Sequence, residues 1–292
     1  MSNRNFRQML ENQWARGNFV CVGLDSEFDK IPLCVRPRWW SWKHWVHYRF
    51  QIIVAFNRAI IEATKDRVCA YKPNAAFYEA YGAEGMMALR RTIADIHLIA
   101  PDVPVIFDAK RGDIGNTNNG YVDAAFRFLQ ADAITVHPYL GAEALKPFLA
   151  CADKGVIVLC KTSNLGAGEF QDWDISGDIM PGGYMQLYKY VAHRVSREWN
   201  ANGNCALVVG ATYPEQLREV RKIVGDMPIL IPGIGAQGGD VEKTVSAGKD
   251  SRGQGMIVNS SRGIIFASKG ADFAEVARRE TIKLHDLINQ YR

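Results

Sequence analysis

Residues 103–110 read VPVIFDAK and are the most informative segment of the chain for its architecture. Apolar, largely β-branched residues come first, a composition typical of a strand buried on both faces of a parallel sheet. The run then ends in Asp108 and Lys110, which are separated by one alanine. Because side chains alternate along a strand, this acid and this base are predicted to point to the same side. The stretch therefore predicts a buried parallel strand with a carboxylate and an ammonium group at its carboxyl end.

Further short apolar runs recur on both sides of this one, separated by longer amphipathic stretches. The runs cover residues 19–25, 68–72, 133–137, 155–161, 205–210, 228–232 and 256–259. Helical spacing of apolar residues marks stretches 77–98, 141–152, 184–199, 214–223 and 272–291. Strand–helix units repeated without a break in composition predict a single (β/α)8 barrel, a TIM barrel, over residues 1–292. The structural alternative is a doubly wound open sheet.

The bulk composition agrees with such a barrel and excludes several classes of protein. Apolar residues make up 48% of the 292 residues and charged residues 23%, which indicates a folded core rather than disorder. The net charge of +4 helps to attract an anionic substrate but is too small to indicate a nucleic-acid partner. No apolar run approaches the roughly 20 residues of a membrane span. We therefore expect neither a nucleic-acid nor a membrane partner.

The amino-terminal residues and the cysteines indicate the compartment. The opening MSNRNFRQMLENQW contains no apolar segment of the kind found in secretory signals. The six cysteines form no C-x-x-C pair, and several lie inside apolar runs, where a free thiol behaves as a small core residue. These features predict a cytoplasmic protein.

Two segments depart from the strand–helix rhythm. Residues 34–50, CVRPRWWSWKHWVHYRF, form a Trp-rich basic segment, which we interpret as an insertion after the first strand. Its aromatic and basic residues allow binding of single-stranded nucleic acid or a membrane surface. A cover for the barrel or a subunit contact is the favoured interpretation. Residues 165–183, LGAGEFQDWDISGDIMPGG, are predicted as a long loop after the fifth strand.

Charged residues gather at the ends of neighbouring strands. Lys72 ends the second run, Asp108 and Lys110 end the third, and Asp113 follows in the next loop. Charged groups at the inner mouth of a barrel are costly to desolvate unless they pair or meet a charged ligand. We predict a network of two ammonium and two carboxylate groups with perturbed pKa values, which marks a functional site. The alternative is a structural cluster of ion pairs at the rim.

A second signal lies after the seventh and eighth runs. Residues 232–240 read PGIGAQGGD, and Arg262 follows the eighth run. Glycine-rich turns that lead into helices offer free backbone N–H groups to an anion. Barrels often bind phosphate at these two loops, and arginine is a bidentate phosphate partner. The sequence therefore predicts a phosphate site.

Other polar residues carry weaker signals. The histidines and cysteines show no spacing suited to a metal site, and Ser163 belongs to no Ser-His-Asp arrangement. His137, at the end of the fourth run, is interpreted as a hydrogen-bonding residue rather than an acid or base. Asn74, Tyr139 and Asn164 are strand-end residues for which a place in the pocket stays open.

Taken together, these motifs resemble those of the orotidine 5′-phosphate decarboxylases. Residues 107–117, FDAKRGDIGNT, match the family signature D-x-K-x-x-D-I-x-x-T. Arg-Gly stands where Phe-His is more common, which resembles the longer bacterial branch of the family. The similarity extends to AYKP at 70–73, LCKTSNLG at 159–166, PGIGAQGGD at 232–240 and NSSRGI at 259–264.

The resemblance implies decarboxylation of orotidine 5′-monophosphate to uridine 5′-monophosphate and carbon dioxide, the last step of de novo pyrimidine biosynthesis, without a cofactor or a metal. It implies that Lys72, Asp108, Lys110 and Asp113 are the catalytic array, with Lys110 as the general acid that protonates pyrimidine C6. Asp108 would face the departing carboxylate. Asp113 and Thr117 would reach into the site of a second subunit, which implies a homodimer with shared sites.

The resemblance also implies the contacts to the rest of the nucleotide. Asp25 and Lys72 match residues that contact the ribose hydroxyls, and Ser163 matches a serine that contacts the pyrimidine amide edge. The matching phosphate-binding positions are Gly235, Gln237, Arg262 and Gly263. Two alternatives stay open: a Mg²⁺-dependent sugar-phosphate lyase of the same suprafamily, and a non-catalytic nucleotide-binding barrel.

Overall fold

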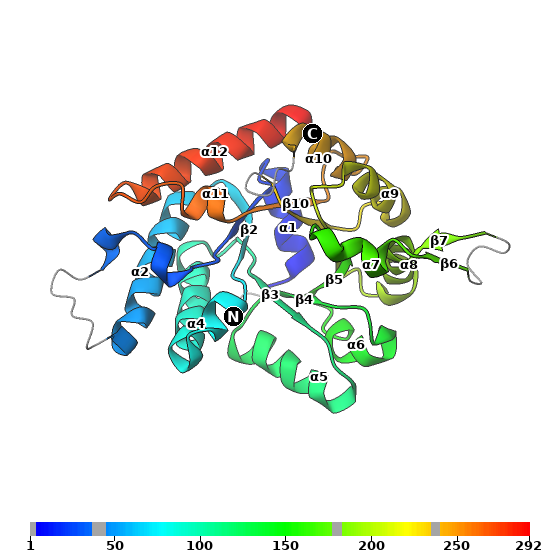
Figure 1. Ribbon diagram of the computed structural model, residues 1–292, viewed down its shortest axis with the longest axis horizontal. Helices are drawn as coiled ribbons and strands as arrows, with labels where there is room; N and C mark the ends of the chain where they lie inside the picture. Colours follow the sequence, from blue (N-terminus) through cyan, green and yellow to red (C-terminus); the bar gives the residue numbers. More distant parts are fainter. Residues whose placement is uncertain (1–3, 37–44, 177–182, 235–239) are drawn as a thin grey trace.

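The computed structural model describes residues 4–36, 45–176, 183–234 and 240–292 (Figure 1). Within these residues, an eight-stranded parallel sheet has the order β2-β1-β10-β9-β8-β5-β4-β3. Each strand coincides with one of the predicted runs, shifted by a few residues at most. Their bounds are β1 Val20–Gly23, β2 Val68–Lys72, β3 Ile106–Arg111, β4 Ala133–Val136, β5 Gly155–Lys161, β8 Cys205–Val209, β9 Ile229–Pro232 and β10 Met256–Ser260.

The sheet closes on itself between β2 and β3. Tyr71 bridges to Val105, and its backbone N–H donates to the carbonyl of Pro104 at 3.1 Å. One step further, Asn74 bridges to Asp108, whose N–H donates to the Pro73 carbonyl at 3.0 Å. These contacts join the two ends of the strand order, so the predicted barrel is confirmed and the open sheet is excluded.

Helices surround the barrel on the outside, as Figure 1 shows. No helix in the described ranges combines the length and the apolar character that a membrane crossing requires. The longer helices are α2 Trp45–Thr64, α4 Gly82–Ile99, α5 Gly115–Val122, α6 Gly141–Leu149, α8 Leu187–Arg194, α9 Pro214–Val224, α10 Val241–Gly248 and α12 Phe273–Tyr291. Shorter helical turns are η1 Phe28–Lys30, η2 Leu33–Val35, α3 Ala76–Glu79, η4 Asp123–Phe128, η5 Leu165–Ala167, α7 Gly168–Gln171, η6 Val195–Trp199 and α11 Arg262–Ile265.

Helix α1 (Phe6–Ala15) covers the amino-terminal end of the barrel. The Asn5 side chain caps it by accepting from the N–H of Gln8 at 3.0 Å. The Trp14 indole N–H donates to the Met256 carbonyl at 2.8 Å. Gly155 leaves room for the ring of Phe6, because a Cβ at position 155 would lie 2.3 Å from that ring. With this end closed, the opposite rim of the barrel is left for a ligand.

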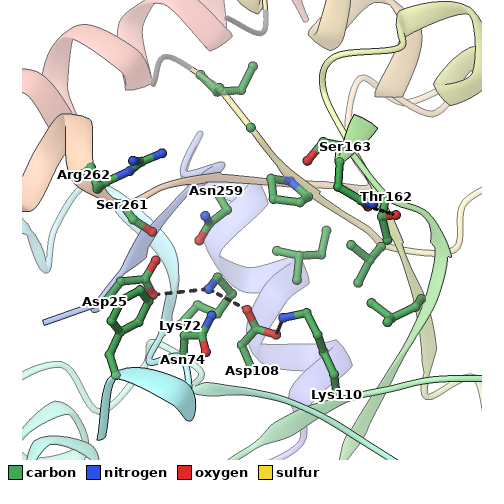
Figure 2. A pocket seen from close by; sticks show the side chains of 18 of the residues that line it. Asp25, Lys72, Asn74, Asp108, Lys110, Thr162, Ser163, Asn259, Ser261 and Arg262 are labelled. Carbon is green, nitrogen blue, oxygen red and sulfur yellow. Dashed lines mark hydrogen bonds and ion pairs between the residues drawn. The ribbon is translucent and has the colours of Figure 1, made fainter. Parts of the chain in front are cut away.

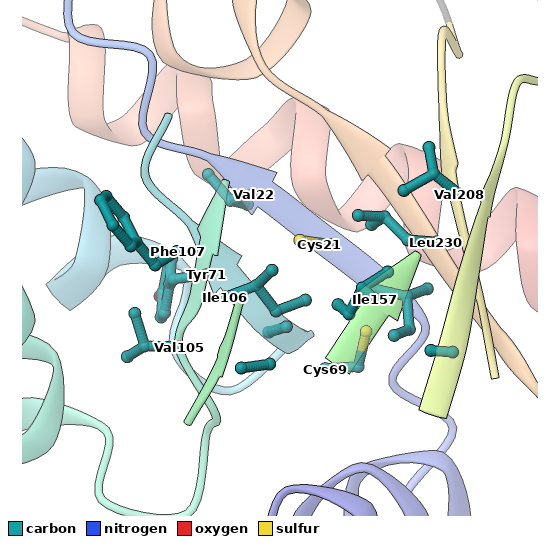
Figure 3. Close-up of a cluster of buried hydrophobic side chains, with 14 of the residues drawn as sticks. Cys21, Val22, Cys69, Tyr71, Val105, Ile106, Phe107, Ile157, Val208 and Leu230 are labelled. Atoms are coloured by element: carbon teal, nitrogen blue, oxygen red, sulfur yellow. The ribbon is translucent and has the colours of Figure 1, made fainter. Parts of the chain in front are cut away.

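Apolar side chains from the strands fill the barrel interior (Figure 3). Cys21, Cys69, Ile106 and Ile157 are fully buried there. Burying one large aliphatic side chain contributes about 1.5–3 kcal/mol, so this layer is a major source of stability. Burial also raises the pKa of Cys21 to about 12, which keeps the thiol protonated. These two cysteines therefore act as small core residues, as predicted.

The two irregular segments differ in detail from the prediction. Residues 45–50, predicted as part of the Trp-rich insertion, are helical and form the start of α2. Residues 37–44 of that segment lie outside the described residues. In the loop after β5, two short strands, β6 (Asp174–Ile175) and β7 (Met185–Gln186), pair antiparallel, and η5 and α7 precede them. Alternation over so few residues is too short to be recognised in the sequence.

Candidate active site

A pocket with a volume of about 680 Å³ opens at the carboxyl end of the barrel strands (Figure 2). This is the rim where barrels place functional side chains. Charged and amide side chains line it together with apolar residues of β5, β8 and β9. The polar lining residues are Asp25, Glu27, Lys72, Asn74, Asp108, Lys110, Thr162, Ser163, Asn164, Gln171, Asn259, Ser261 and Arg262.

Asp108 lies between two lysines at the floor of the pocket. Its Oδ2 accepts from Lys72 Nζ at 2.9 Å, and its Oδ1 accepts from Lys110 Nζ at 2.7 Å. The Lys72 side chain is only 4% exposed, whereas that of Lys110 is 49% exposed. Lys72 is thus enclosed by protein, while Lys110 presents its ammonium group to the pocket.

The charges of this cluster hold one another in the ionised state. Burial by itself raises the pKa of Asp108, but the ammonium groups of Lys72 and Lys110 outweigh it and place this pKa well below its usual value. Burial by itself lowers the pKa of Lys72, but the carboxylates of Asp108 and Asp25 outweigh it and raise this pKa. Asp108 is therefore ionised and Lys72 protonated around neutral pH.

The backbone of β3 bends where Lys110 enters the pocket. Lys110 has φ +49°, in the left-handed region that side chains other than glycine rarely adopt. Its N–H donates to Thr135 Oγ1 at 2.9 Å, and the Thr135 hydroxyl donates to Asp108 Oδ1 at 2.9 Å. Asp108 and Lys110 meet as predicted. What brings them together is not regular alternation along the strand but a bend that Thr135 of β4 stabilises. Thr135 was missed because a threonine inside the run AITV carries no signal of its own.

Asp25 approaches the cluster from the end of β1. Its Oδ1 lies 3.7 Å from Lys72 Nζ, so Asp25 is a second carboxylate next to Lys72 within the same chain. A buried polar network holds this loop in place. The Ser26 hydroxyl donates to Asn57 Oδ1 at 2.5 Å, and the hydroxyl of Tyr78 donates to the Leu24 carbonyl at 2.9 Å.

Asp113 and Thr117 do not line the pocket of their own chain. They lie in the loop after β3 and the first turns of α5. Asp113 Oδ1 accepts from the N–H of Ile114 at 2.7 Å, while its own N–H donates to Asn118 Oδ1 at 3.0 Å. Within one chain the predicted array of four is therefore present as Lys72, Asp108 and Lys110.

The described part of the predicted phosphate site lies on the side of the pocket away from Asp108 and Lys110 (Figure 2). Arg262, the first residue of α11, lines it together with Ser261 and the turn after β9. Gly233 in this turn has φ +103°, a conformation that favours glycine. Gly263 follows Arg262 but is not among the lining residues. The predicted residues Gly235 and Gln237 lie outside the described residues.

The wall formed by the β5 loop contains Ser163, as predicted, with Thr162 and Gln171 beside it. Gln171 Nε2 donates to Thr162 Oγ1 at 2.8 Å, and the Thr162 N–H donates to Gln171 Oε1 at 2.9 Å. At the end of β5, the buried Lys161 ammonium group donates to Asp172 Oδ1 at 2.7 Å. A buried cation at the strand end thus holds the loop that carries this wall.

The remaining strand-end residues divide clearly. Asn74 and Asn164 line the pocket, whereas Tyr139 is 88% exposed and does not. His137 Nε2 lies 3.1 Å from the Gly112 carbonyl, which confirms its interpretation as a hydrogen-bonding residue. Among the described residues, no group of three or more His, Cys, Asp or Glu side chains is arranged to hold a metal ion.

Comparison with known proteins leads to the same family as the motifs. The model of the "Orotidine 5'-phosphate decarboxylase / HUMPS family" matches residues 19–277. An orotidine 5′-phosphate decarboxylase of Cellvibrio japonicus is 45% identical over 99% of both chains, and one of Ralstonia pickettii is 46% identical over 98% of this chain and 99% of its own. The solved OMP decarboxylase of Leishmania donovani superposes with a TM-score of 0.78 at 36% identity, covering 98% of this chain and 99% of its own.

A closed barrel with a charged cluster at one end of the pocket and an arginine at the other defines a barrel enzyme for anionic substrates. Within that class, the chain belongs to the orotidine 5′-phosphate decarboxylase / HUMPS family. The resemblance inferred from its motifs is thereby confirmed.

Proposed function

We propose that this enzyme converts orotidine 5′-monophosphate to uridine 5′-monophosphate and carbon dioxide, and that it does so without a cofactor. The observation that carries the proposal is Asp108, which accepts hydrogen bonds from both Lys72 and Lys110 at the pocket floor. Full-length similarity to orotidine 5′-phosphate decarboxylases supports this activity over that of a sugar-phosphate lyase or a non-catalytic barrel.

Lys110 is the proposed general acid. When the bond between pyrimidine C6 and the carboxylate breaks, its electron pair stays on C6 and carbon dioxide leaves. C6 then takes a proton from the Lys110 ammonium group, and the neutral amine regains a proton from solvent. The half-exposed position of Lys110 supports this role, because its ammonium group faces the space in which the ring would lie.

The fixed charges favour the transition state over the bound substrate. A carbanion that develops at C6 is stabilised by the nearby Lys110 cation, and this attraction grows along the reaction coordinate. The Asp108 carboxylate, ionised by its two lysine partners, would face the substrate carboxylate that is lost. Lys72 keeps that charge in place while remaining enclosed itself.

The other contacts follow the length of the pocket. Arg262 is proposed to bind the phosphate together with Gly235, Gln237 and Gly263, and Ser163 to bind the pyrimidine amide edge. Asp25 and Lys72, on the side of β1 and β2, are proposed to contact the ribose hydroxyls. Phosphate binding far from C6 then supplies binding energy that helps to assemble the site around the ring.

A homodimer with shared sites is the proposed assembly. Asp113 and Thr117 follow β3, whose Asp108 and Lys110 line the pocket, but they are themselves outside the lining of their own chain. Ile114 and Tyr139, on the neighbouring loops after β3 and β4, are 63% and 88% exposed, as expected for apolar groups that a second copy covers. In this arrangement Asp113 completes the array of the partner subunit. We also propose a cytoplasmic location and a single barrel domain over residues 1–292.

The test is an ultraviolet assay that follows the loss of orotidine 5′-monophosphate by the purified protein. Turnover without added metal and unchanged by EDTA is expected. Turnover of a sugar phosphate instead, abolished by EDTA, would establish the lyase alternative. No turnover of either substrate, together with tight nucleotide binding, would indicate a non-catalytic barrel.

A further inference from the structure

We infer that Asn259 is a specificity-determining residue of this pocket, whose side-chain amide binds a ribose hydroxyl of the nucleotide. The inference rests on the proposed function and adds a sugar contact to it. Asn259 ends the apolar run MIVN and opens the NSSRGI motif, but the resemblance assigned it no role.

Asn259 is placed between the two ends of the pocket. It lies on β10, in register with Cys21 of β1 on one side and Pro232 of β9 on the other. Figure 2 shows its side chain next to Lys72, with Ser261 and Arg262 beyond it toward the other end of the pocket. In a nucleotide the sugar lies between the base and the phosphate. Asn259, midway along the pocket, would therefore face the sugar of a bound nucleotide.

The side-chain oxygen of Asn259 has no hydrogen-bond partner among the described residues. The residue is 6% exposed, and this oxygen is buried. Asp25 Oδ1, on the neighbouring strand end, is likewise buried without a hydrogen bond. Buried polar atoms without partners are costly and uncommon in folded proteins, and a ligand site is one setting that retains them.

The neighbouring residues do not offer the missing partners. Pro232 has no N–H, and Lys72, whose ammonium group donates to Asp108, makes no hydrogen bond with Asn259 Oδ1. Gly23 keeps the corner beside the amide open, because a Cβ there would lie 3.3 Å from Asn259 Oδ1 and 1.8 Å from Ser261 Oγ. An amide can both donate and accept, which matches a hydroxyl group and does not favour a charged one.

The experiment measures binding of uridine 5′-monophosphate and its 2′-deoxy and 3′-deoxy analogues by calorimetry. For the wild-type protein, removing the hydroxyl that Asn259 binds should weaken binding on the order of tenfold. Asn259→Ala should bind uridine 5′-monophosphate about tenfold more weakly, and its further loss with that one analogue should be smaller than the loss in the wild type. Asn164→Ala, which alters an amide on the β5 wall, is the control and should keep the full discrimination.

Each outcome decides one question. If Asn259→Ala discriminates between the ribo and both deoxy nucleotides as well as the wild type does, Asn259 binds no hydroxyl, although the proposed function still stands. If the wild type binds none of the nucleotides, the proposed function itself fails. Should Asn259→Ala not fold, Asn259→Ser keeps a smaller polar group at this position and is measured in the same way.

Discussion

Lys72, at the end of β2, donates to Asp108 of β3 at 2.9 Å across the junction that closes the barrel. This ion pair therefore forms only when the barrel is closed, because β2 and β3 stand at the two ends of the strand order. It also leaves the other oxygen of Asp108 free to hold Lys110 at 2.7 Å.

Replacing Lys110 with alanine should remove the proton donor and leave the nucleotide site standing. General acid catalysis contributes about 10²–10⁴-fold, so kcat should fall by at least that factor while uridine 5′-monophosphate still binds. Steady-state kinetics and calorimetry measure the two quantities. Near-normal turnover in this variant would refute the assignment of Lys110 as the proton donor.

Mixing two inactive variants tests the shared sites. Asp113→Ala and Lys110→Ala lose different parts of the array, so a mixed dimer contains one site with both residues intact. Activity should return when the two proteins are mixed and their subunits exchange, up to about a quarter of the wild-type level if exchange is random and each site acts alone. If differently tagged subunits demonstrably exchange and activity does not return, Asp113 acts within its own chain or not at all.

Asp108 should also make the folded state sensitive to acid. Its folded-state pKa lies below the unfolded value of about 3.9, so the stabilisation is fully present above that value and is lost as the pH falls further. Asp108→Asn removes this response and leaves the buried Lys72 with only the more distant carboxylate of Asp25, 3.7 Å away, which costs up to about 3–5 kcal/mol. Urea unfolding at pH 7 and pH 3 measures both effects. An equal loss of stability between these two pH values in wild type and variant would show that other groups cause the acid sensitivity.

The Lys161–Asp172 pair should respond differently to loss of each partner. The Lys161 side chain is 2% exposed and that of Asp172 38% exposed. Asp172→Ala leaves a buried cation unpaired and should lower the free energy of unfolding by about 3 kcal/mol. Lys161→Met leaves a carboxylate that water can reach, so a smaller loss of stability is expected. The double variant should regain much of the stability that Asp172→Ala alone loses.

The same pair should influence substrate binding. Because the Asp172 loop carries Gln171, which bonds to Thr162 next to Ser163, Lys161→Met should raise KM more than it lowers kcat. Kinetics on the three variants, together with urea unfolding, provide the measurements. A fall in kcat at unchanged KM would contradict a role in positioning this wall.

Much of the barrel and part of the site could be predicted from sequence. Continuous apolar runs predicted all the barrel strands, because strands buried on both faces leave few polar positions. The polar residues after those runs predicted Lys72, Asp108, Lys110, Ser163 and Arg262 as pocket residues, and the structure places all of them in one pocket. The short helices and the β6–β7 pair after β5 were missed, since so few residues carry no periodicity.

Burial, the strand ends and the family resemblance could be inferred from the order of the residues. Four features became clear only in the folded chain: Asp25 lies near Lys72, Thr135 supports the bend at Lys110, Lys161 holds Asp172, and Asp113 lies outside its own pocket. The physical reason is that burial and strand order are properties of local segments. Contacts between side chains on different strands depend instead on how the strands are staggered when the barrel closes.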